Sequence, residues 1–156
     1  MTVLKRILLV DDEANVLRAL RRTLQWDGYQ IFTVTNPIDA LELMTVDPVD
    51  LVVSDCMMPG MTGIELFAQM YKLWPDTARV MLTGLSDHEV ALAALEKGSI
   101  FRFLTKPWDD VDLRITVRQA LEHRTLKLES RHLLDFMDRR HETLETLVDV
   151  VGAAKA

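Results

Sequence analysis

Five short runs of branched and aromatic residues recur along the chain, and each is followed by a segment whose apolar positions have helical spacing. We expect strands at residues 6–10, 30–35, 50–54, 79–83 and 101–105. The expected helices cover residues 13–26, 38–45, 63–74 and 87–97, and a longer one begins at residue 110. Near-continuous apolar character in the first, third and fourth runs predicts strands buried on both faces, as in a parallel sheet.

The regular alternation of strand and helix predicts an α/β fold with right-handed crossovers, a doubly wound sandwich around a five-stranded parallel sheet. Turn and capping residues stand where helices should end or begin, since Gly28 and Gly98 follow helices and Asn36 with Pro37 precedes one. In such a fold the functional site lies at the carboxyl ends of the strands.

Composition narrows the class of protein. Of 156 residues, 49% are hydrophobic and 27% are charged, which is typical of a soluble globular domain. The net charge of −6, without a cluster of Lys and Arg, argues against direct nucleic-acid binding. The single cysteine, Cys56, fits a reducing compartment, and the first residues resemble neither a signal peptide nor a membrane span. We therefore expect a cytoplasmic protein that does not contact the membrane.

The residues at the ends of the expected strands have complementary chemistry: Asp11, Asp12, Asp55, Thr83 and Lys106. Taken singly, an acid could cap a helix or open a turn, and the lysine could be a solvated surface charge. Together they predict a site, because three converging carboxylates would repel one another unless a divalent cation such as Mg²⁺ lay among them. A carboxylate beside that cation could act as a nucleophile toward a phosphoryl donor and form an aspartyl phosphate.

Four segments carry a family resemblance: residues 7–13 (ILLVDDE), 55–63 (DCMMPGMTG), 81–84 (MLTG) and 104–107 (LTKP). Across about residues 4–122 the sequence closely resembles the receiver domain of response regulators in two-component signalling, which has a flavodoxin-like (βα)5 fold. Residues 101–110 are similar to receivers that precede cyclic-di-GMP phosphodiesterases or enhancer-dependent transcription activators. We find neither output in this sequence, so a downstream output domain would be absent from the chain.

The resemblance implies that Asp55 is the phosphoacceptor and that a sensor histidine kinase supplies the phosphoryl group. It also implies a Mg²⁺ ion, for which Mn²⁺ can substitute, held by Asp11, Asp12, Asp55 and the backbone carbonyl of Met57. No catalysis beyond the chain's own phosphorylation and dephosphorylation is expected.

The same resemblance implies that Thr83 and Lys106 bind the phosphoryl group, and that the bond between Lys106 and Pro107 is cis. It implies that Phe103 turns inward when Thr83 is drawn toward the phosphoryl group, so that the surface of the fourth helix, fifth strand and fifth helix changes. Without the resemblance, sequence alone does not separate a switch from core or half-buried packing at Phe103, and packing is the more frequent role of a strand aromatic.

The end of the chain forms a second part, and we expect a receiver domain at residues 1–122 and a helical extension at residues 123–156. Apolar residues follow alternating spacings of three and four, interrupted by Ser130 and Arg140. This predicts a coiled-coil seam and a homodimer. The seam consists of Leu126, Leu133, Met137, Leu144, Leu147 and Val151. A helix folded back on its own domain and a frayed tail are the alternatives.

Three functions fit these observations. The favoured one is a phosphorylation-controlled, dimerising regulatory module, and the second is a stand-alone receiver that acts by protein contact. The third, an aspartate-nucleophile phosphatase, would require a general acid two residues after Asp55, where Met57 stands.

Overall fold

The computed structural model describes residues 3–155 and contains one parallel five-stranded sheet in the order β2-β1-β3-β4-β5. The strands are β1 (Arg6–Val10), β2 (Gln30–Val34), β3 (Leu51–Asp55), β4 (Ala78–Thr83) and β5 (Arg102–Thr105). The helices are α1 (Ala14–Leu24), α2 (Pro37–Val46), α3 (Gly63–Leu73), α4 (His88–Glu96) and α5 (Asp110–Lys155), with short 3-10 turns η1 (Gln25–Asp27) and η2 (Leu85–Asp87). The predicted doubly wound fold, including its extended last helix, is confirmed.

Element boundaries differ from the predicted ones by one or two residues. Helix α1 ends at Leu24 because the chain tightens into η1 and then turns at Gly28, whose φ of 80° is easily adopted only by glycine. Strand β3 runs to Asp55, one residue further than predicted. Gly152 does not end α5, which continues to Lys155.

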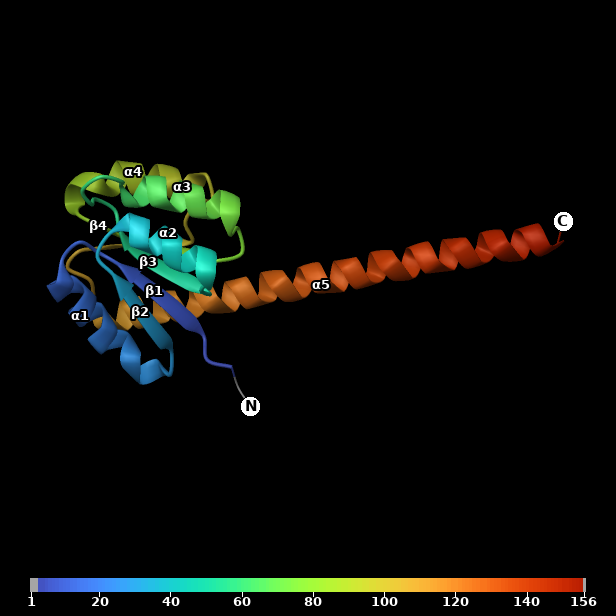
Figure 1. The fold of residues 1–156 in the computed structure, drawn as a ribbon, viewed down its shortest axis with the longest axis horizontal. Helices are drawn as coiled ribbons and strands as arrows, with labels where there is room; N and C mark the ends of the chain where they lie inside the picture. The colour runs from blue at the N-terminus through green and yellow to red at the C-terminus, as the bar shows by residue number, and fades with distance from the viewer. Residues whose placement is uncertain (1–2, 156) are drawn as a thin grey trace. The chain divides into compact units, whose positions relative to one another are not determined.

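The two faces of the sheet carry separate apolar cores, and alternate residues of each strand supply them. Leu8 and Val52 point to the side covered by α2, α3 and α4, whereas Ile7 and Leu51 point to the side covered by α1 and the first turns of α5 (Figure 1). Each of these four side chains is fully buried. Such alternation explains why the central strands read as nearly continuous apolar runs.

Local signals fix where two helices begin. The Asn36 side chain accepts a hydrogen bond from the Asp39 backbone N–H at 2.8 Å, and Pro37 occupies the first helical position of α2. The Thr62 hydroxyl oxygen accepts from the Glu65 N–H at 3.1 Å and starts α3. This second cap lies just after β3, so it fixes the loop that follows Asp55.

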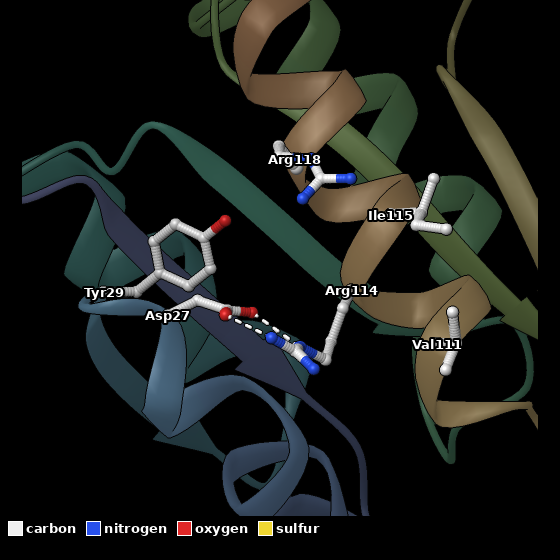
Figure 2. A pocket seen from close by; sticks show the side chains of 6 residues that line it. All are labelled: Asp27, Tyr29, Val111, Arg114, Ile115 and Arg118. Carbon is white, nitrogen blue, oxygen red and sulfur yellow. Dashed lines mark hydrogen bonds and ion pairs between the residues drawn. The ribbon is translucent and has the colours of Figure 1, made fainter.

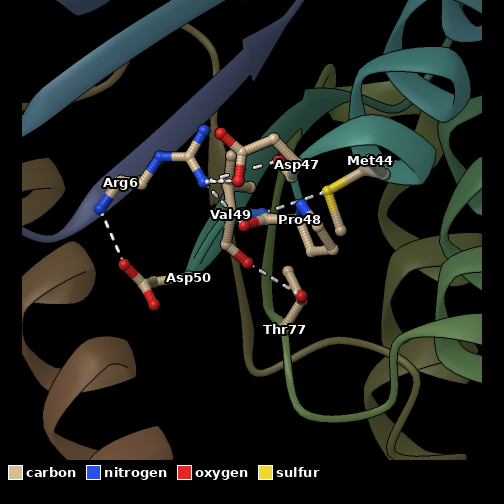
Figure 3. A network of polar contacts seen from close by, with 7 residues as sticks. All are labelled: Arg6, Met44, Asp47, Pro48, Val49, Asp50 and Thr77. Atoms are coloured by element: carbon tan, nitrogen blue, oxygen red, sulfur yellow. Dashed lines mark hydrogen bonds and ion pairs between the residues drawn. The ribbon is translucent and has the colours of Figure 1, made fainter.

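Polar contacts tie together the amino ends of the strands (Figure 3). Arg6 Nη1 lies 2.6 Å from Asp47 Oδ1, and the Arg6 backbone N–H donates to Asp50 Oδ2 at 2.7 Å. The other oxygen of Asp50 lies 3.2 Å from Arg124 Nη1, on α5. Thr77 closes the network by donating its hydroxyl to the Val49 carbonyl at 2.9 Å.

The chain divides into two compact units, residues 1–124 and 125–156. In the second unit the six residues of the predicted seam are all exposed, from 51% at Val151 to 65% at Leu126. Among residues 3–155, no helix combines the length and the apolar character needed to span a bilayer.

Candidate functional site

The residues predicted to carry chemistry lie together at the carboxyl edge of the sheet. Asp11 directly follows β1, Asp55 ends β3, Thr83 ends β4, and Lys106 directly follows β5. Their strands are neighbours in the order β1-β3-β4-β5. The Lys106 backbone N–H donates to the Thr83 carbonyl at 2.7 Å, so the ladder between the last two strands extends to the lysine itself.

Lys106 joins two of the three acids. Its Nζ lies 2.9 Å from Asp11 Oδ2 and 3.2 Å from Asp55 Oδ1. Asp11 is fully buried, and its second oxygen accepts a hydrogen bond from the Glu13 backbone N–H at 2.9 Å. The side chain of Asp55 retains 13% exposure, so it is the acid of this pair that a reactant can reach.

The local charge balance is unfavourable for ionised carboxylates. Burial raises the pKa of Asp55 above its ordinary value; the Lys106 charge opposes that rise, and the charges of Asp11 and Asp12 add to it. Burial also acts against the charged form of Lys106, but its hydrogen bond to Asp11 and the charges of both acids outweigh this and raise the lysine pKa. The single positive charge of Lys106 therefore faces three carboxyl groups, which is too little to compensate all of them.

The three acids are placed to share a cation. One carboxylate oxygen from each of Asp11, Asp12 and Asp55 lies within 4.8 Å of the other two. Because Mg²⁺ binds oxygens at about 2 Å, two ligand oxygens on opposite sides of the ion are about 4 Å apart. The donor set consists of hard oxygens and its spacing is close to this limit, so the residues present fit a small divalent cation.

Thr83 lies at the same edge of the sheet, at the end of β4, and its hydroxyl has no partner among the described residues. Its Oγ1 is buried, and none of residues 3–155 forms a hydrogen bond with it. A buried hydroxyl without a partner costs about 1–3 kcal/mol, and such groups are rare in native proteins. The orphaned donor is therefore suited to a ligand oxygen.

Phe103 is half-buried and packs against the core on the α4 side of the sheet. Its ring contacts the ring of His88, the first residue of α4, with centroids 5.6 Å apart. His88 Nε2 also lies 3.1 Å from the Thr105 hydroxyl oxygen. Sequence reasoning missed His88, because nothing in the sequence indicates which strand residue the first turn of α4 would meet.

The loop after Asp55 approaches the next helix very closely. The Gly63 N–H donates to the Cys56 carbonyl at 2.8 Å, and a Cβ at position 63 would lie 2.1 Å from the backbone oxygen of Asp55. Cys56 is buried, and burial followed by the nearby charges of Asp87 and Asp55 raises the pKa of its thiol to about 11. Cys56 is therefore a protonated core residue rather than a reactive thiolate.

The other predicted ligand, Met57, lies two residues beyond Asp55 in the same loop, with its side chain 56% exposed. The bond between Lys106 and Pro107 is cis, as expected. A separate pocket of about 400 Å³ lies between η1 and α5, where Asp27 and Arg114 form an ion pair at 2.7 Å (Figure 2). It contains none of the predicted site residues.

Comparison with known proteins gives a consistent result. The family model described as "Response regulator receiver domain" matches residues 7–118. The hydrogenase transcriptional regulatory protein HoxA of Cupriavidus necator is 36% identical over 121 residues, which cover 78% of this chain and 25% of that protein. The C4-dicarboxylate transport transcriptional regulatory protein DctD of Pseudomonas aeruginosa is 38% identical over 140 residues, which cover 88% of this chain and 29% of that protein.

Among solved structures, the signal receiver domain of an HD domain-containing protein from Pseudomonas fluorescens Pf-5 superposes with a TM-score of 0.74 at 37% identity, covering 79% of this chain and 98% of that one. This chain spans little more than a quarter of the length of the two transcriptional regulators. The similarity therefore concerns only the matched part of each regulator, and it says nothing of the rest of those proteins.

Proposed function

We propose a function that proceeds from one fact, namely that this chain belongs to the response regulator receiver domain family. In this proposal a sensor histidine kinase phosphorylates Asp55. An Asp55 carboxylate oxygen attacks the phosphorus of a phosphohistidine, the new O–P bond forms, and the P–N bond to the kinase breaks. The observation that carries the proposal is the meeting of Asp11, Asp12, Asp55 and Lys106 at one edge of the sheet.

Lys106 and Thr83 stabilise the phosphoryl group once it is on Asp55. The Lys106 ammonium, now 3.2 Å from Asp55, would donate a charge-assisted hydrogen bond to a phosphoryl oxygen. Thr83 would donate its unpaired hydroxyl to another. The Thr83 hydroxyl would thereby gain the hydrogen-bond partner that it lacks, and Lys106, which Asp11 and Asp55 share, would gain a phosphoryl oxygen.

A divalent cation, Mg²⁺ or Mn²⁺, would be held by Asp11, Asp12, Asp55 and the Met57 carbonyl. When bound, it supplies positive charge that neutralises oxygens of the transferring group. The three carboxylates would bind the cation, and Lys106 would compensate part of the remaining negative charge.

Phosphorylation changes the surface formed by α4, β5 and the first turns of α5. Drawing the Thr83 hydroxyl toward the phosphoryl group leaves space on the α4 side of the sheet, and Phe103 turns into that space. This change on the α4-β5-α5 face is what a partner or a downstream output domain would detect.

Intact-mass measurement tests the phosphoacceptor directly. After incubation with acetyl phosphate and MgCl₂, the protein should gain the mass of one phosphoryl group, and Asp55→Asn should gain none. Asp50→Asn is the matched control, because this acid lies just before the same strand and is bonded to Arg6 and Arg124 instead. Equal labelling of the Asp55→Asn variant would refute the proposal.

The helical extension at residues 123–156 would make the receiver at residues 1–122 a homodimer. The support is the row of exposed apolar residues along the helix from Leu126 to Val151, which keeps the spacing of three and four positions except where Ser130 and Arg140 interrupt it. On a helix these residues share one face, and burying them against a second copy would remove a large apolar surface from water.

Light scattering with and without beryllofluoride tests the dimer. Replacing Leu133, Met137 and Leu144 by serine should convert dimer to monomer. Replacing Asp135, Glu142 and Asp149 by serine is the matched control, because these acids recur every seven residues on the opposite side of the helix. A monomeric unmodified chain in both conditions would instead favour the stand-alone receiver.

A further inference from the structure

Two histidine–phenylalanine contacts lie on opposite faces of the sheet. His88 contacts Phe103 with ring centroids 5.6 Å apart, on the side of α2, α3 and α4. His123 contacts Phe101 with centroids 5.3 Å apart, on the side of α1 and α5. Within residues 3–155, His88 but not His123 also makes a polar contact with the sheet, because its Nε2 lies 3.1 Å from Thr105 Oγ1.

Thr105 lies next to the residues that would respond to phosphorylation. It pairs with Thr83 in the parallel register of β4 and β5, so the two side chains leave the same face of the sheet. It also directly precedes Lys106, which contacts Asp11 and Asp55. His88 therefore connects the start of α4 to the strand residue that neighbours the orphaned Thr83 hydroxyl.

We propose that His88 is a positioning residue that sets how readily the phosphoryl group recruits Thr83. We name its hydrogen bond to Thr105 and its ring contact with Phe103 the His88 latch. This inference rests on the proposed function, because it concerns the response of Thr83 and Phe103 to the phosphorylated Asp55.

The latch opposes the change for a geometric reason. Inward rotation of Phe103 separates its ring from His88, and a shift of β5 with Thr83 lengthens the His88–Thr105 hydrogen bond. Both contacts favour the arrangement in which the Thr83 hydroxyl is unengaged. A ligand that requires the other arrangement has its apparent affinity multiplied by the fraction of molecules in that arrangement. The latch lowers this fraction, so it weakens binding.

The hydrogen bond is the part of the latch that can be removed most cleanly. A His88→Phe substitution keeps an aromatic ring against Phe103 but cannot bond to Thr105. Because His88 is exposed, the bond lies at the low end of the usual net range, so removing it should tighten binding about threefold.

Beryllofluoride with MgCl₂, titrated into the full chain and followed by ¹⁹F NMR, tests the latch. His88→Phe and Thr105→Val should each tighten binding about threefold, and the double variant should gain no more than either single one. His123→Phe is the matched control, because it makes the same change in the other histidine–phenylalanine pair, and its affinity should equal that of the unmodified chain.

The outcomes separate the latch from the proposed function. If the unmodified chain binds no beryllofluoride, both are overturned. If it binds and His88→Phe leaves the affinity unchanged or weakens it, the latch is wrong while the phosphoacceptor site stands. Additive effects of His88→Phe and Thr105→Val would show that the two residues act separately, which also overturns the latch. Thermal melts of the four variants and the unmodified chain would identify a variant that binds differently because it is misfolded.

Discussion

The two edges of the sheet contain the same kinds of charged residues in different proportions. At the amino edge, Arg6 lies 2.6 Å from Asp47 and Arg124 lies 3.2 Å from Asp50, so each acid has its own cation. At the carboxyl edge, Lys106 is shared between Asp11 and Asp55. A third acid, Asp12, lies close to both.

This difference separates ion pairs that are balanced from a cluster in which acids outnumber cations. At the amino edge the pairs need nothing further, and they tie β1, β3 and α5 together. At the carboxyl edge the excess of acids disfavours the folded state until a cation or a proton compensates it. The ion pairs of the amino edge are each neutral, whereas the carboxyl edge has more acids than cations.

Removing Lys106 from the carboxyl edge should have the largest effect. Lys106→Met leaves Asp11 buried without its ion pair and Asp55 beside two other acids, so in EDTA it should lower the free energy of unfolding by about 3 kcal/mol. Mg²⁺ should restore most of that loss. Urea denaturation with EDTA or MgCl₂ measures both values, and equal destabilisation in the two conditions would contradict the charge imbalance.

A smaller effect is expected from the backbone of the carboxyl edge. Gly63→Ala places a Cβ 2.1 Å from the Asp55 backbone oxygen, so the loop must move, at a cost of about 2 kcal/mol. Gly152→Ala is the control, because no atom outside its chain neighbours and its own stretch of helix backbone lies within 4 Å of its Cβ position, and alanine favours the helix. Denaturation of both variants measures their free energies of unfolding. An unchanged free energy of unfolding in Gly63→Ala would show that the loop accommodates the added Cβ.

Most of the fold follows from patterns within single segments. The apolar run at residues 6–10 and its counterparts predict strands, and their alternation with helical spacing predicts both the parallel sheet and its carboxyl edge. The meeting of Asp11, Asp55 and Lys106 then follows, because parallel strands end at the same edge. The site's location thus depends only on topology.

What could not be predicted depends on contacts between segments far apart in the chain. Arg6 bonds Asp50 across 44 residues, and His88 approaches Thr105 across 17 residues. Such pairs are set by the docking of a helix or loop on the sheet, which no local periodicity encodes. The close approach of Gly63 to Asp55 is local, but it could not be predicted either, since a glycine at a helix start has several explanations in sequence alone.

Mg²⁺ binding should distinguish the two edges through a smaller change in stability. At a concentration about five times its dissociation constant, Mg²⁺ should stabilise the unmodified chain by about 1 kcal/mol. Asp12→Asn should lose most of this gain, because it removes one of three clustered carboxylates. Asp50→Asn should lower stability but keep the gain, since its partners are Arg6 and Arg124. Thermal melts with and without MgCl₂ measure this stabilisation by Mg²⁺. If the stabilisation is unchanged in Asp12→Asn, Asp12 does not bind the cation.

The smallest effect should come from the exposed pair at the amino edge. The Asp47 side chain is 66% exposed, so its ion pair with Arg6 is screened by water and salt despite the 2.6 Å distance. Asp47→Asn should therefore change the free energy of unfolding by about 0.5 kcal/mol or less, identically in EDTA and MgCl₂. Urea denaturation at low and high salt checks this, because the difference from the unmodified chain should shrink as salt increases. A Mg²⁺-dependent effect of Asp47→Asn would mean that the two edges are electrostatically coupled through the strands that join them.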